Sequence, residues 1–105
     1  MVTHDIPHDL VPELARRAAQ KAVQSYKEGL SKYDVQADWV SDDRVELSFA
    51  VKGKRLHGAM TVRPNDLHLE LDVPLLFRPF SKLAIGVIER EAREWIDKAQ
   101  AGQLE

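Results

Sequence analysis

The middle of the chain, residues 35–73, places apolar side chains at every second position. The inward positions of this alternation are Val35, Ala37 and Trp39, then Val45, Leu47, Phe49 and Val51, then Leu56, Gly58, Met60 and Val62, and finally Leu67, Leu69, Leu71 and Val73. Successive side chains of a strand point to opposite faces, and a slip by one residue would turn the whole apolar set to water. The pattern therefore predicts four antiparallel strands, each with one buried face.

Short connections between these strands contain residues that favour tight turns. Gly53 and Lys54 fit the two central positions of a type II′ hairpin, which opposes Phe49 to Gly58. A turn at Pro64 and Asn65 and a three-residue loop at 41–43 complete a meander of consecutive strands. We also expect the Phe49 ring to fill the space that the missing side chain of Gly58 leaves.

Two segments with helical periodicity flank the predicted meander. From Leu10 onward one half of a helical wheel is apolar, with Asp9 as the expected N-terminal cap. A second helix follows Pro79. The inward residues are Leu14, Ala15, Ala18, Ala22, Val23, Tyr26 and Leu30 in the first helix, and Ala84, Ile85, Ile88, Ala92, Trp95, Ile96 and Ala99 in the second.

The outward positions of the predicted strands are polar, so both helices must cover the other face of the sheet. A further strand over residues 2–6 ends at Pro7 and suits a sheet edge. The predicted fold is α+β: a two-layer sandwich with a four- to five-stranded antiparallel sheet, two amphipathic helices on one face, and the order β-α-β-β-β-β-α.

Composition and charge limit the classes of function. The chain has 105 residues, a formal net charge of -2 and no cysteine. We take residues 1–103 as a single domain, since residues 104–105 resemble a cloning remnant. The charge balance does not favour nucleic acid as a partner, and no apolar run is long enough to span a membrane. Without a visible secretory signal, we expect a cytoplasmic protein.

Histidines are the main candidates for chemistry. His4 and His8 lie four residues apart, but Pro7 interrupts their segment, and we expect both to be surface residues. In the predicted register His57 lies opposite Asp72, an arrangement found in acid–base sites. Both residues lie on the open face of the sheet, with no pocket implied around them. We therefore expect no metal, no other cofactor and no catalytic activity.

The segment 73–80, VPLLFRPF, is too apolar for an ordinary connection between a strand and a helix. With Leu83 and Val87 it forms a second apolar stripe on the second helix, and Arg78 and Lys82 lie at its edge. Two interpretations are open. The segment folds back and buries Leu76 and Phe77 against the core, or it leaves an apolar patch exposed for a partner.

The sequence resembles the polyhydroxyalkanoic acid system family, found in bacteria that store polyester granules. The residues that carry the resemblance are His8-Asp9-Leu10, Ala15 to Ala19, Trp39, Gly58, Asp72-Val73-Pro74, Arg78-Pro79-Phe80 and Ile88 to Glu91. The resemblance implies a cytoplasmic protein associated with polyester granules or with the genes that handle them. It implies no established catalytic residues.

Two functions from different classes follow. The first is a non-enzymatic accessory protein of polyhydroxyalkanoate metabolism, which meets a granule surface, a granule protein or a second copy of itself. The second is a small domain for a fatty-acid-like ligand, although a pocket of about 300 Å³ or more would hollow out so small a core. The first would use Leu76, Phe77, Arg78, Phe80, Leu83 and Val87; the second would use a cavity between Trp39, Phe49, Met60 and Trp95.

Overall fold

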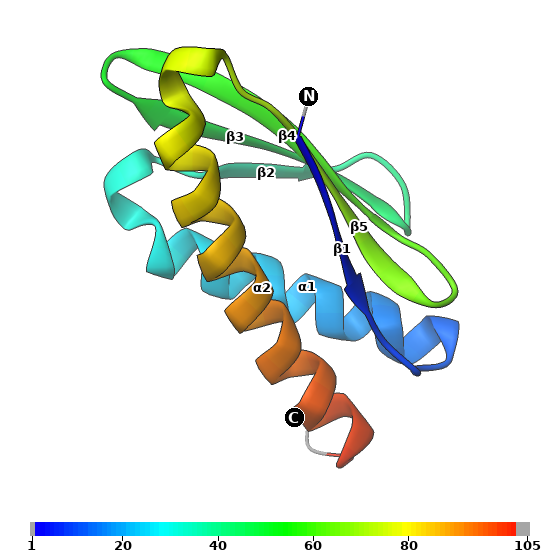
Figure 1. The fold of residues 1–105 in the computed structure, drawn as a ribbon. Coiled ribbons are helices and arrows are strands. Elements are labelled where there is room, and N and C mark those ends of the chain that lie inside the picture. Colours follow the sequence, from blue (N-terminus) through cyan, green and yellow to red (C-terminus); the bar gives the residue numbers. More distant parts are fainter. Residues whose placement is uncertain (1, 103–105) are drawn as a thin grey trace.

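Five antiparallel strands and two helices form the part of the chain that the computed structural model describes, residues 2–102 (Figure 1). The prediction for residues 104–105 lies outside it. The elements are β1 (Val2–Pro7), α1 (Pro12–Gly29), β2 (Gln36–Trp39), β3 (Arg44–Val51), β4 (Lys54–Val62), β5 (Asp66–Asp72) and α2 (Arg78–Gln100), with short 3-10 helices η1 (Ser31–Tyr33) and η2 (Leu75–Phe77). The predicted α+β fold and order of elements are confirmed.

The sheet has the strand order β1-β5-β4-β3-β2, so the predicted N-terminal strand lies at one edge and β2 at the other. Both helices pack on the same face, and α2 runs diagonally across the layer (Figure 1). The core between the layers contains the inward side chains of all five strands, including Ile6, Phe49 and Met60, each at most 1% exposed. The register of β4 with β5 is as predicted, with Val62 opposite Leu67.

The turn between β3 and β4 differs from the prediction. Its central residues are Lys52 and Gly53, and Phe49 lies opposite Leu56 instead of Gly58. Both central residues have positive φ, 51° for Lys52 and 78° for Gly53, as a type I′ turn requires. The predicted and observed registers differ by two residues, so both keep the same side chains inward, and the apolar pattern cannot distinguish them.

Gly58 is required by a close approach of β5. A Cβ at this position would lie 2.5 Å from the carbonyl oxygen of Glu70 and 2.7 Å from Leu71 Cδ2. The space beside this glycine is therefore occupied by β5 and the Leu71 side chain, and not by the Phe49 ring as predicted.

Helix α1 begins without the predicted Asp9 cap. Its N-cap residue is Val11, which makes no side-chain capping bond, and Pro12 occupies the first turn, where a missing N–H costs little. Small side chains on the buried face allow α1 to lie close to α2. In the last turn of α1 the buried Tyr26 hydroxyl donates to Met60 Sδ at 3.6 Å and so connects the helix to β4. Burial raises the pKa of the Tyr26 hydroxyl well above its usual range, and the negative charge of Glu91 adds to the shift.

Both N-terminal histidines make side-chain hydrogen bonds, and the burial of His8 corrects its interpretation as a surface residue. His8 is 5% exposed; its Nε2 donates to the carbonyl oxygen of Arg63 at 2.9 Å, and its Nδ1 accepts from the N–H of Leu10 at 3.1 Å. Because a carbonyl can only accept and an N–H can only donate, this pattern requires the neutral ring protonated at Nε2. His4 is hydrogen-bonded to Glu89 and connects the edge strand β1 to α2.

Candidate functional site: an apolar pocket at one end of the sheet

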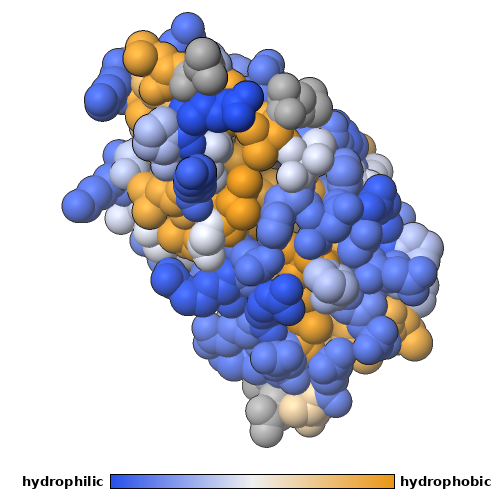
Figure 2. Space-filling view, in the orientation of Figure 1, coloured by the Kyte–Doolittle hydropathy of each residue, from blue (hydrophilic) through white to orange (hydrophobic). Residues whose placement is uncertain are grey.

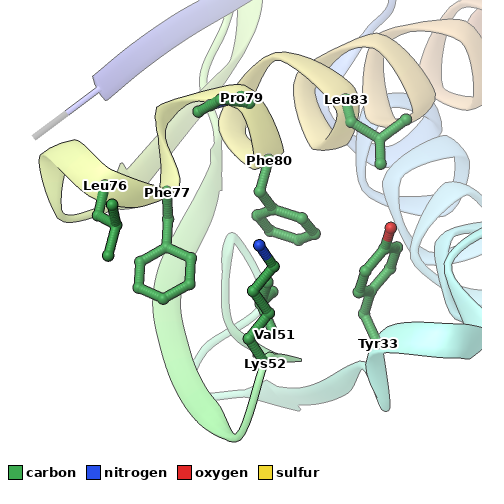
Figure 3. Close-up of a pocket in the computed structure, with 8 residues that line it drawn as sticks. All are labelled: Tyr33, Val51, Lys52, Leu76, Phe77, Pro79, Phe80 and Leu83. Atoms are coloured by element: carbon green, nitrogen blue, oxygen red, sulfur yellow. The ribbon is translucent and has the colours of Figure 1, made fainter.

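Four separate segments meet at the end of the sheet where β3 turns into β4. They are η1, the β3–β4 turn, η2 and the first turns of α2 (Figure 3). An open pocket of about 360 Å³ lies between them. Its lining residues are Tyr33, Val51, Lys52, Leu76, Phe77, Pro79, Phe80 and Leu83. The first interpretation of the segment 73–80, a connection folded back into the core, thus holds for only part of it.

Phe80 forms the floor of the pocket. Its side chain is 8% exposed, and its ring makes edge contacts with Tyr33, with centroids 4.9 Å apart, and with Phe49, with centroids 5.7 Å apart. Val87, two turns further along α2, is also buried, and its Cγ1 would lie 3.3 Å from a Cβ at Gly29. Phe80 and Val87 therefore belong to the core, although the sequence placed both in a candidate binding surface.

The rim of the pocket is the exposed apolar part. Leu76 is 85% exposed and Leu83 is 46% exposed, while Phe77 is half-buried between rim and floor. The space-filling view shows apolar side chains gathered at the end of the molecule formed by η2 and the start of α2, with mostly polar residues over the lower part of the same face (Figure 2). The interpretation in which Leu76 folds back against the core is therefore wrong: this residue lies in η2 with its side chain exposed.

Positive charge surrounds this end of the molecule. Lys52 lines the pocket, and exposed Arg78 and Lys82 adjoin lining residues in the first turns of α2. None of the three forms an ion pair with any residue in the range 2–102. The nearby Asp34 is already paired, because its carboxylate accepts a hydrogen bond from Arg55 at 2.6 Å. The pocket is therefore apolar inside and cationic at its edge.

The four residues of the predicted interior cavity do not surround a common space. Phe49 and Met60 are fully buried in the packed core. Trp95 lies between the helices, where its indole N–H donates to Ser25 Oγ at 2.9 Å. Trp39 lines a separate surface groove between β2 and α1. The structure thus brings together most of the predicted patch and not the predicted cavity.

The open face of the sheet carries the imidazole–carboxylate pairs. His57 lies opposite Asp72, as predicted, but the imidazole–carboxylate hydrogen bond described on this face joins His68 Nδ1 to Asp5 Oδ1. Asp5 also pairs with Arg63 at 3.3 Å. None of these residues lines the apolar pocket. In the range 2–102, no group of three or more histidine, cysteine, aspartate or glutamate residues has metal-binding geometry.

Comparisons with known proteins agree with the sequence resemblance. A family model described as Putative polyhydroxyalkanoic acid system protein matches residues 3–96 of the chain. No curated protein and no solved structure matches it. In addition, no helix among the residues described is long and apolar enough to cross a membrane.

Proposed function

Starting from the fact that the chain belongs to the polyhydroxyalkanoic acid system family, we propose that it is a non-catalytic accessory protein that binds the surface of polyester granules in the cytoplasm. It binds through the apolar rim at the end of the sheet. The observation that carries this proposal is the exposure of Leu76 and Leu83 beside an apolar pocket. Contiguous exposed apolar surface of this kind is typical of interaction sites in soluble proteins.

The rim can supply a useful binding energy. At about 2 kcal/mol for a fully buried leucine, the exposed fractions of Leu76 (85%) and Leu83 (46%) correspond to about 2.6 kcal/mol. This free energy corresponds to a nearly hundred-fold change in affinity. Arg78 and Lys82 suit such a surface, because their aliphatic stems can lie along an apolar body while their charged ends stay in water.

The non-catalytic part of the proposal rests on the composition of the pocket. Its lining contains one lysine and one tyrosine as polar groups, and neither a carboxylate nor an imidazole that could serve as general acid or base. Incubation of the protein with purified granules tests this directly. Release of soluble hydroxy acid above the rate of a protein-free control would contradict the proposal.

Docking is tested by co-sedimentation of the purified protein with native granules and with granules stripped of their proteins. The informative variant is Leu76→Ser/Leu83→Ser, because both side chains are exposed and their loss should leave the fold intact. Val11→Ser/Val40→Ser is a matched control: these valines are 59% and 51% exposed, Val11 precedes α1 and Val40 follows β2, and neither lines the pocket.

The proposal predicts that wild type and the control pair sediment with stripped granules and that the leucine variant stays in solution. Sedimentation with native granules alone would contradict direct docking and indicate a granule protein as the partner. Loss of a dimer in the leucine variant, with no granule binding by wild type, would show that the rim is a subunit interface. Light scattering on the same samples gives the oligomeric state.

A further inference from the structure

One charged side chain, Lys52, lines an otherwise apolar and aromatic pocket. The Lys52 side chain extends from the β3–β4 turn toward Phe80 at the start of α2 (Figure 3). A small-molecule site typically has this composition, with many apolar groups for affinity and few polar groups for orientation. The pocket volume of about 360 Å³ lies at the lower end of the range for such sites.

The backbone at Lys52 is unusual for a lysine. Its φ of 51° places it in the left-handed region, which asparagine and glycine adopt readily and other residues adopt at a cost. The first central position of a type I′ turn normally carries one of those residues. The chain thus has a lysine where turn stability alone favours asparagine, and this lysine lines the pocket.

The surroundings strengthen the positive field at the mouth of the pocket. Lys32, Arg78 and Lys82 are exposed, and each adjoins a lining residue in the sequence. None of the three forms an ion pair within the part of the chain that the structure describes. An apolar pocket with a cationic mouth is complementary to a molecule that has an apolar tail and an anionic head.

We propose that this pocket binds a single-chain carboxylate amphiphile, such as a medium-chain fatty acid. The acyl chain lies against Phe77, Phe80 and Leu83, and the carboxylate meets the ammonium group of Lys52. This inference rests on the proposed function in that it assigns a ligand class to the same end of the molecule. Its test contains no granules, so failure of ligand binding and failure of granule docking are separate results.

The test is calorimetric titration of the protein with three ligands that share one chain: decanoate, decanol and decyltrimethylammonium, each below the concentration at which it forms micelles. Decanoate should bind about ten-fold more tightly than decanol, because only its carboxylate can form a charge-assisted contact with the ammonium group of Lys52. The cationic ligand should bind least. Equal affinity for decanoate and decanol, or no binding of decanoate, would overturn the proposal.

Variants identify the residue responsible. Lys52→Asn and Lys52→Gln should each lower the affinity for decanoate about ten-fold and leave the affinity for decanol unchanged. Lys21→Gln, an exposed site on α1 with the same change in net charge, should alter neither value. Amide chemical-shift changes on adding decanoate should centre on Tyr33 and Phe77. If they centre elsewhere, or if Lys52→Gln binds decanoate as tightly as wild type does, the assignment is wrong.

Discussion

Replacing Phe80 with alanine should cost far more stability than the same change at Leu76, only four residues earlier. Phe80 is 8% exposed and makes edge contacts with the rings of Tyr33 and Phe49, whereas Leu76 is 85% exposed. Truncation of a buried phenylalanine typically costs about 3 to 5 kcal/mol, and aromatic pairs add about 0.5 to 1.5 kcal/mol each beyond their burial. Truncation of an exposed leucine stays within about 0.5 kcal/mol.

A domain of this size is stable by about 5 to 15 kcal/mol, so Phe80→Ala should lower the urea midpoint sharply or unfold the chain. Leu76→Ala should leave the midpoint unchanged. The assay is urea unfolding followed by tryptophan fluorescence, which Trp39 and Trp95 provide because both pack, partly buried, against the core. A cost below about 1 kcal/mol for Phe80→Ala, or above about 1 kcal/mol for Leu76→Ala, would refute the division of this segment into a buried floor and an exposed rim.

Further predictions concern the turn, the sheet and two titrating groups. Lys52→Asn should raise the free energy of unfolding, by a few tenths to about 1 kcal/mol, because asparagine tolerates the left-handed region; urea unfolding measures it. Gly58→Ala should lower the same quantity by about 2 kcal/mol, because the new Cβ meets the β5 backbone; an unchanged midpoint would contradict the observed register. The pKa of Tyr26 is raised in the folded state, so the unfolded chain loses this proton first as pH rises. The free energy of unfolding should therefore fall by up to about 1.4 kcal/mol per pH unit above pH 10.0. Tyr26→Phe should reduce this slope. The hydrogen bond from His4 lowers the pKa of Glu89, so this pair contributes stability above about pH 4.5 that is lost as pH falls below that value. A plot of urea midpoint against pH shows this loss, and His4→Asn should flatten that part of the curve.

The strands and their faces could be predicted because alternation of apolar residues determines which side chains are buried. The register of β3 with β4 could not, since moving the turn from Lys52 and Gly53 to Gly53 and Lys54 changes the pairing by two residues and preserves every face. The observed turn places Lys52 at a position with positive φ, where asparagine or glycine is preferred, so turn preferences do not predict it.

The sequence predicted only part of the candidate site, because the rest depends on contacts between remote segments. Segment 73–80 is apolar throughout, and helical periodicity places Phe80, Leu83 and Val87 on one stripe. Which of these residues are buried depends on elements far away in the sequence: Phe80 contacts η1 and β3, and Val87 lies against the end of α1. Lys52 could not be assigned to the site from sequence, because nothing local connects a turn lysine to the start of α2.

The histidine contacts were missed because their partners are remote. His8 bonds to Arg63 and His4 to Glu89, and these partners lie more than fifty residues along the chain. His4 lies in the predicted strand over residues 2–6 and His8 follows Pro7, but neither position indicates which remote residue is the partner. The only local signal was weak: Pro7 and Asp9 flank His8, and they favour a change of chain direction that the His8 ring then stabilises.

The measurement that tests the central claim most directly is a binding isotherm on protein-stripped polyester granules for wild type and for Leu76→Ser/Leu83→Ser. The exposed fractions of these two leucines predict a loss of nearly a hundred-fold in affinity, measured under conditions where both proteins are folded. Equal affinities for the two folded proteins would contradict the account and show that the apolar rim does not bind the granule.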